Sequence, residues 1–179
     1  MKLERRSEPW NPYRIAVLLE QAKLIASYGV FTGGWAWHFM SPPHQEVKSI
    51  HDHKDIDFFV FPDKCAELIQ LLKENGYEKT WTKYDGITPN FIRYSKYEEG
   101  EEIVKVILDL FIEEVPHTLV KHKDDDFFVV EPATLITFYN KEGKKHSSEE
   151  CVAVQAARKL VREGIAPILN KELVGEWGI

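Results

Sequence analysis

Two apolar segments that carry aspartates on one face constrain the fold of this chain more than any other feature. The first is "DIDFFVF" at 55–61, and the second is "EIVKVILDLFI" at 102–112. Both are rich in β-branched and aromatic residues, which favour strands. A carboxylate within such a buried segment is costly unless something pairs with it. The chain therefore predicts a sheet with an acidic site on one face.

The spacing of the aspartates indicates where this site lies. Side chains alternate across a strand, so Asp55 and Asp57 share a face, with their Cα atoms roughly 6.5–7 Å apart. In the second segment, Asp109 lies on the face opposite to the valines and leucines of that strand. If the two strands are neighbours, the three carboxylates meet. Carboxylates so placed repel each other unless a cation lies between them, and Mg²⁺ often binds one or two carboxylates together with substrate phosphates.

A pair of glycines precedes these strands and suggests a second part of the site. Gly33 and Gly34 follow the short apolar stretch "VFT" and precede the aromatic turn "WAWHFM". Glycine permits unusual backbone angles, and a turn that opens a helix directs backbone N–H groups toward an anion. This segment is predicted to hold phosphate, and the aspartates are predicted to hold the cation that a triphosphate requires.

Periodicity indicates an α+β fold with a mixed β-sheet flanked by helices and a small C-terminal helical part. Helices are expected over 11–28 and 62–75, and two more are expected beyond residue 131, one begun near Pro132 and one over 147–164. Two short strands are expected between residues 77 and 93, and "KHKDDD" at 121–126 is expected to be a charged loop. The predicted domains are 1–120 and 121–179. This boundary is soft, and one compact domain is the alternative.

Net charge, apolar run length and cysteine content limit the kinds of partner and the cellular location that we expect for this chain. The chain has 179 residues and a formal net charge of −6, whereas proteins that bind mainly to phosphate backbones are usually basic. Nucleic acid is therefore a less favoured partner. The apolar runs are shorter than the ~20 residues of a membrane helix, and the first ten residues do not resemble a secretory signal. Cys65 and Cys151 are expected to be reduced thiols, and the cytoplasm is the expected location.

These motifs resemble the nucleotidyltransferase superfamily related to DNA polymerase β. The pattern is a Gly-Gly turn, an Asp-x-Asp strand and a third aspartate in a later strand. The segments "GGWAWHF" and "HKDIDFFV" are similar to those of lincosamide nucleotidyltransferases and aminoglycoside 2″-adenylyltransferases. The matching residues are Gly33, Gly34, Trp35, Ala36, His53, Asp55, Ile56, Asp57 and Asp109, and the resemblance covers roughly residues 12–112.

The resemblance implies Mg²⁺-dependent transfer of a nucleoside monophosphate from a nucleoside triphosphate, such as ATP, to a hydroxyl group. Asp55 and Asp57 would bind one or two Mg²⁺ ions, and Asp109 would be a third ligand or the general base. Gly33, Gly34 and Trp35 would form the nucleotide-binding turn. The expected acceptor is a small molecule, with an antibiotic-like compound as one candidate class.

Other interpretations of these residues remain open. Asp55 and Asp57 are also compatible with a solvated strand start, and Asp109 with an ion pair to Lys105, four residues earlier on the same face. Trp35 is more often a core residue than a surface on which a base stacks. His51 and His53 give only a weak zinc pattern.

Other functions also remain open. An enzyme of the same chemistry that modifies RNA or protein, as toxin-like relatives do, is the first alternative. A second is a non-catalytic nucleotide-binding protein of the same fold, although the presence of all three acids argues against it. A metal-dependent nuclease is a third, but it leaves the two glycines unexplained. The sequence gives no indication of the oligomeric state.

Overall fold

The computed structural model describes residues 12–40 and 55–139, and the structural statements below refer to these residues. The helices are α1 (Pro12–Ile25), α2 (Gly33–Met40), α4 (Cys65–Glu74) and α5 (Pro132–Tyr139), with single 3₁₀ turns η2 (Ala26–Tyr28) and η3 (Pro62–Lys64). The strands are β1 (Gly29–Phe31), β2 (Asp55–Val60), β3 (Glu78–Thr80), β4 (Phe91–Glu98), β5 (Val104–Ile112), β6 (His117–His122) and β7 (Asp125–Val130). The α+β class predicted from the sequence is confirmed.

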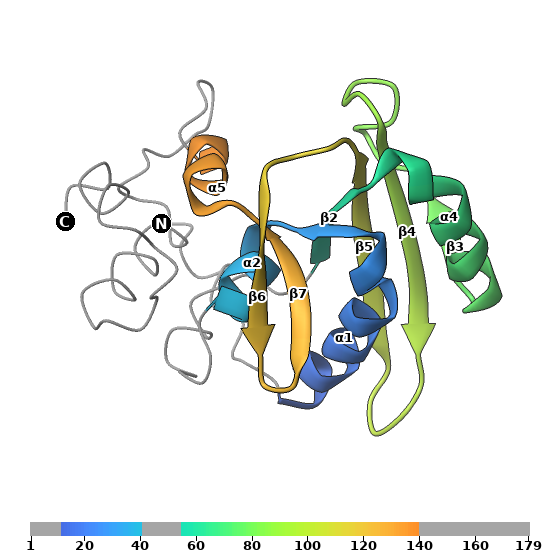
Figure 1. The fold of residues 1–179 in the computed structure, drawn as a ribbon. Coiled ribbons are helices and arrows are strands. Elements are labelled where there is room, and N and C mark those ends of the chain that lie inside the picture. Colours follow the sequence, from blue (N-terminus) through green and yellow to red (C-terminus); the bar gives the residue numbers. More distant parts are fainter. Residues whose placement is uncertain (1–11, 41–54, 140–179) are drawn as a thin grey trace, which may run out of the picture.

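All seven strands form one mixed sheet in the order β3-β4-β5-β2-β1-β7-β6 (Figure 1). Strand β2 pairs parallel with β5, and β1 pairs parallel with β7. The other neighbouring strands are antiparallel. The two aspartate-bearing segments are therefore adjacent near the middle of the sheet, as the sequence predicts.

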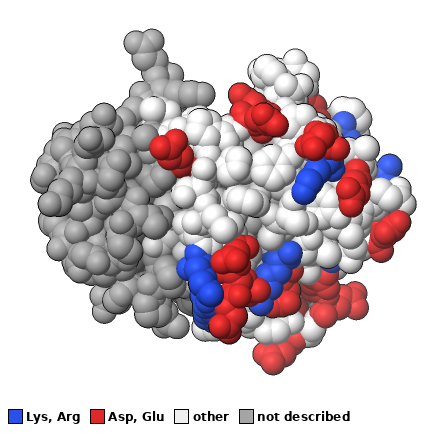
Figure 2. Space-filling model, in the orientation of Figure 1, with Lys and Arg blue, Asp and Glu red and all other residues white. Residues whose placement is uncertain are grey.

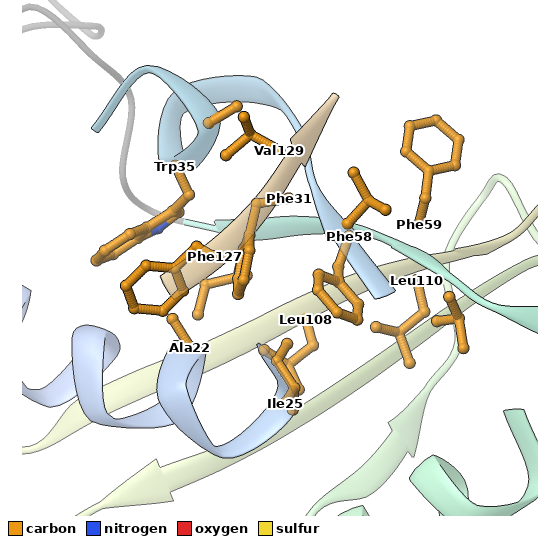
Figure 3. Close-up of a cluster of buried hydrophobic side chains, with 14 of the residues drawn as sticks. Ala22, Ile25, Phe31, Trp35, Phe58, Phe59, Leu108, Leu110, Phe127 and Val129 are labelled. Atoms are coloured by element: carbon orange, nitrogen blue, oxygen red, sulfur yellow. The ribbon is translucent and has the colours of Figure 1, made fainter. Parts of the chain in front are cut away.

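Helix α1 covers the apolar face of the sheet and explains the alternation in the strands. Its buried residues Leu18, Ala22 and Ile25 recur at helical spacing and pack in the same core cluster as Phe58 and Leu108. Figure 3 shows Ala22 and Ile25 of the helix close to Phe58 and Leu108 of the strands. Because this face is filled by apolar side chains, the aspartates, at the alternate positions of β2 and β5, lie on the opposite face.

Hydrogen bonds at the two ends of helix α4 attach the chain to helix α1 and to the 3₁₀ turn η2, which follows α1. The phenol of Tyr77, just after α4, donates to Oε1 of Gln21 at 2.7 Å. The ammonium of Lys64 donates to the backbone oxygen of Ser27 at 2.9 Å. These contacts fix the chain at both ends of α4 and hold the start of β1 in place.

The region 117–130 forms a β-hairpin that the sequence interpretation missed. The segment 121–126 was predicted to be a charged loop, but Lys121 and His122 belong to β6, and Asp125 and Asp126 belong to β7. Only Lys123 and Asp124 form the turn, and Lys123 has a positive φ of 56°. The charged residues Lys121, Asp125 and Asp126 are compatible with strands because they lie beside the turn with their side chains exposed.

The C-terminal part is described only as far as α5. This helix begins at Pro132, as predicted, and the further helix expected near residues 147–164 lies outside the described residues. The domain division at residue 120 stays a prediction; that position falls within β6. No helix in the described part is long and apolar enough to cross a membrane.

Charged side chains are interspersed over the face of the described part shown in Figure 2, where acidic groups are more prominent than basic ones. This distribution agrees with the net charge of −6. A surface that follows a phosphate backbone would instead carry clustered lysines and arginines. The visible face therefore offers no such surface.

Candidate active site

Three charged residues form a row across strands β2, β5 and β4. Asp57 is the register partner of Asp109 in the parallel pair, and Asp109 is the register partner of Arg93 in the antiparallel pair. Asp55 lies on the same face of β2, one step along the strand, opposite Ile107. The strand pairing expected from the sequence is confirmed, while the chemical roles of the three acids stay predictions.

Arg93 binds the Asp109 carboxylate through two parallel hydrogen bonds. Its Nε donates to Oδ1 at 2.6 Å, and its Nη2 donates to Oδ2 at 2.7 Å. The same Nη2 lies 3.6 Å from Oδ2 of Asp55. The guanidinium therefore spans two of the three carboxylates. A bidentate pair of this kind is among the stronger charge-assisted interactions in proteins.

The pKa of Arg93 is raised by its position beside the three aspartates. Its hydrogen bond to Asp109 raises the pKa of Arg93, partial burial opposes this, and the charges of Asp109, Asp55 and Asp57 raise it further. The side chain of Asp109 is only 11% exposed. A partly buried carboxylate needs such a partner because burial disfavours an isolated charge.

Arg93 is the site residue that sequence reasoning missed. The ion pair between Asp109 and Lys105, which the sequence left open as an alternative, is not formed; Nζ of Lys105 lies 5.7 Å from the ring centroid of Tyr97. The segment "FIRYSKYE" at 91–98 is rich in aromatic and β-branched residues, which favour a strand, but its buried positions do not alternate, so the sequence gives no clear signal for the face of Arg93. The register that places it beside Asp109 comes from the pairing of β4 with β5.

Gly33 lies directly against Asp57. A Cβ atom at Gly33 would be 2.6 Å from Oδ2 of Asp57, and its φ of +60° is a conformation that L-residues rarely adopt. The preceding residue fixes this approach, because the N–H of Thr32 donates to the backbone oxygen of Asp57 at 3.0 Å. The start of α2 is thereby positioned beside the acidic row, which consists of Asp55, Asp57 and Asp109.

The remaining residues of the glycine turn divide between helix and core. Gly34 lies in the first turn of α2. The side chain of Trp35 is fully buried, and its ring packs against His38 and Phe39 with centroids 4.8 and 5.7 Å apart. The indole therefore belongs to the core, as the alternative interpretation expected, and its predicted contribution to nucleotide binding would have to come from its backbone.

An aromatic row lies next to the charged row on the same face. It consists of Phe59, Phe111 and Phe91, each two positions from a charged residue of β2, β5 and β4. The Phe59–Phe111 and Phe111–Phe91 centroids are 5.4 Å apart. Phe138 of α5 continues the row at 5.7 Å from Phe59. These rings lower the local polarity beside the acids, which strengthens electrostatic interactions there.

The acids offer oxygen ligands of the type that Mg²⁺ prefers. Within residues 12–40 and 55–139, no group of three or more histidines, cysteines, aspartates and glutamates is arranged to hold a metal ion. Both oxygens of Asp109 already accept hydrogen bonds from Arg93. Asp55 and Asp57 share one face of β2 and supply two further carboxylates of the kind that suits a hard divalent cation. His51 and His53 lie outside the described residues.

The fold is shared with structures that include nucleotidyltransferases. No protein-family model matches the chain, and no curated protein matches its sequence. Among solved structures, JHP933 from Helicobacter pylori has a TM-score of 0.58 and 13% identity over 92% of this chain and 72% of that protein. A presumed nucleotidyltransferase from H. pylori has a TM-score of 0.58 and 15% identity over 90% and 72%.

An antibiotic-modifying enzyme has the same fold. The lincosamide antibiotic adenylyltransferase LnuA, in a lincomycin-bound structure, has a TM-score of 0.52 and 12% identity over 82% of this chain and 96% of that protein. Similarity at this level of identity concerns the fold. It confirms the nucleotidyltransferase-like architecture predicted from the Gly-Gly turn and the aspartate-bearing strands.

Proposed function

We propose that this protein transfers a nucleoside monophosphate from a nucleoside triphosphate to a hydroxyl group of a small molecule in a Mg²⁺-dependent reaction in the cytoplasm. The observation that carries this proposal is the side-by-side position of Asp57 and Asp109, with Gly33 packed against the Asp57 carboxylate. Acids and a backbone turn so arranged can hold a cation beside a phosphate.

Each residue has a proposed role in this reaction. Asp55 and Asp57 would hold Mg²⁺, which, when bound, neutralises charge on the phosphates. The N–H groups of the Gly33–Gly34 turn would bind phosphate oxygens. The acceptor oxygen attacks the α-phosphorus, the bond from that phosphorus to the bridging oxygen breaks, and pyrophosphate leaves.

Asp109 is proposed to receive the proton of the acceptor hydroxyl or to act as a third metal ligand. Its two hydrogen bonds with Arg93 leave one further lone pair on each carboxylate oxygen. Asp109 lies on a different strand from Asp55 and Asp57, so it can face the acceptor rather than the triphosphate.

A small acceptor is favoured over a macromolecule. LnuA binds lincomycin, as the name of its structure states. The acidic total charge of this chain is unfavourable for RNA. The buried rings of Phe59 and Phe91, with the half-buried Phe111 between them, make the surroundings of the acids apolar, which suits an acceptor with an apolar portion better than a polycation.

The proposal is tested by incubating the protein with each of the four α-labelled ribonucleoside triphosphates, Mg²⁺, and pools of small-molecule, RNA and protein acceptors. We expect label on a small hydroxyl compound and release of pyrophosphate. Asp57→Asn should abolish both, whereas Asp63→Asn, which removes an exposed aspartate in η3, should not. If only RNA or protein is labelled, the proposal of a small-molecule acceptor is wrong. If Asp57→Asn still transfers the nucleotide, the proposed active site is wrong.

A further inference from the structure

We propose that Arg93 is the internal counter-cation of the acidic row and competes with a divalent cation for the Asp109 carboxylate. This inference rests on the proposed function, which places the metal at the same acids. It concerns the binding of metal and nucleoside triphosphate: Arg93 would make tight metal binding depend on the presence of the nucleoside triphosphate.

The first support is the position of the guanidinium. It donates to both oxygens of Asp109 at 2.6 and 2.7 Å, and its Nη2 is 3.6 Å from the nearer oxygen of Asp55. A cation shared by Asp55 and Asp109 would have to lie in the same region between β2 and β5. The positive charge of Arg93 therefore already lies beside two of the three carboxylates.

The second support is that Arg93 is held there by the fold. Its strand partner is Asp109, and its side chain is only 23% exposed. On the next step of β4, Ser95 is tied to β3 because its hydroxyl and that of Thr80 are 2.6 Å apart. The base of the Arg93 side chain is thus fixed, and only its flexible outer part can change partner.

Competition follows from charge and from geometry. A divalent ion at the acids and the guanidinium repel each other, and this repulsion is strong at a partly buried site. Mg²⁺ also requires near-ideal octahedral oxygen ligands at roughly 2.0–2.1 Å, which Asp109 provides poorly while it faces Arg93. A metal that takes Asp109 as a ligand without a triphosphate would therefore lie beside the positive charge of Arg93, with no added negative charge to offset the repulsion.

The triphosphate changes this balance. It adds negative charge beside the row, so that Arg93 can exchange the carboxylate for a phosphate oxygen, which guanidinium groups bind equally well. Metal and triphosphate would then bind with positive cooperativity, because each makes the other's binding more favourable. Arg93 is a positioning residue in this scheme, since it acts through Asp109 and through the charge of the site.

The experiment measures Mn²⁺ affinity by electron paramagnetic resonance, with and without a non-hydrolysable nucleoside triphosphate, and the melting temperature in metal-free buffer. For Arg93→Met we expect about tenfold tighter binding of Mn²⁺ alone, within the usual range for coupled sites, together with a smaller gain from the triphosphate. The melting temperature without metal should fall because the carboxylates lose their counter-cation.

The control is Lys105→Met, which removes the same charge from an exposed position of β5 and should leave Mn²⁺ affinity unchanged. Should Arg93→Met fail to fold, Arg93→Lys keeps the charge without the two parallel hydrogen bonds and should shift the affinity in the same direction by less. If the Arg93 variant that folds binds Mn²⁺ like Lys105→Met, the inference is overturned.

Failure of the proposed function gives a different result. If the proposed function is wrong, adding triphosphate does not improve Mn²⁺ binding by the wild-type protein, or Asp57→Asn does not remove the improvement. The inference about Arg93 then fails together with the proposed function. If the wild-type protein shows such binding and the Arg93 variant gains no affinity, only the role of Arg93 is wrong.

Discussion

Gly33 packs so closely on Asp57 that a side chain at position 33 has no room. The nearest atom to its hypothetical Cβ is the carboxylate oxygen Oδ2, at 2.6 Å. The glycine turn and the acidic row are therefore in direct contact, although twenty-three residues separate Gly33 from Asp57 in the sequence. A substitution at position 33 should affect both the backbone of the turn and the carboxylate.

Gly33→Ala should lower the free energy of unfolding and abolish nucleotide-dependent stabilisation. The positive φ alone costs an L-residue roughly 1–2 kcal/mol, and the contact with Asp57 adds to this. Gly76→Ala is the matched control, because Gly76 has a φ of +81° and open space around it. Both free energies are measured by urea unfolding, and nucleotide binding by the shift in melting temperature with triphosphate and Mg²⁺. Equal effects of the two variants would contradict a specific contact with Asp57.

The residues show which parts of this fold are readable from sequence. Strands β2 and β5 have a strong alternating pattern, so the shared face of Asp55 and Asp57 and the opposite face of Val106 and Leu108 are as predicted. Alternation is a local property of a strand. The face on which each residue lies can therefore be predicted from the sequence without knowing which strand is its neighbour.

The missed features depend on pairing between strands. Arg93 meets Asp109 because β4 aligns with β5 in one register, and register is set by long-range contacts. The β6–β7 hairpin was hidden by its charged residues, which strands tolerate here because their side chains are exposed beside the turn. The run "FFVV" at 127–130, of which Phe127, Val129 and Val130 are buried, was the available signal for β7.

The aromatic centre of the core gives a stability prediction that is independent of function. Phe31 is fully buried, with ring centroids 4.8 Å from Phe58, 4.9 Å from Phe39 and 5.8 Å from Phe127. Phe31→Ala should lower the free energy of unfolding by about 3–5 kcal/mol, because it removes buried contacts and leaves a cavity. Leu119→Ala on edge strand β6, where the side chain is 54% exposed, should change it by less than about 0.5 kcal/mol. Urea unfolding followed by tryptophan fluorescence compares the two.

Alkaline pH should destabilise the fold through Tyr77. Burial is the main cause that raises the pKa of this phenol, whereas an unfolded tyrosine has a pKa of about 10. Above pH 10 the unfolded chain releases this proton and the folded chain retains it, so the free energy of unfolding falls as pH rises, by up to ~1.4 kcal/mol per pH unit. Burial also raises the pKa of Tyr94 and Cys65, which adds to the fall.

Variants of the Tyr77–Gln21 pair separate titration from the loss of a hydrogen bond. Tyr77→Phe should make the decrease between pH 9.5 and 11 smaller. Gln21→Met removes the acceptor of the 2.7 Å hydrogen bond but keeps the buried phenol, so its decrease should remain. Unfolding by urea at each pH gives both slopes. Identical slopes for Tyr77→Phe and the wild-type protein would show that other groups cause the alkaline effect.

The role of Asp109 is the most demanding prediction, because Arg93 already binds both of its carboxylate oxygens. If Asp109 accepts the proton of the acceptor hydroxyl, Asp109→Asn should lower turnover by about 10²–10⁴-fold, the usual contribution of a general base, and leave triphosphate binding largely intact. Single-turnover transfer of labelled nucleotide at saturating Mg²⁺ measures the chemical step. Arg93→Met keeps the carboxylate, so its turnover under these conditions should fall less than that of Asp109→Asn. Should Asp109→Asn lose Mg²⁺-dependent triphosphate binding as severely as Asp57→Asn, Asp109 is a metal ligand first. Turnover at the wild-type rate would remove Asp109 from the reaction altogether.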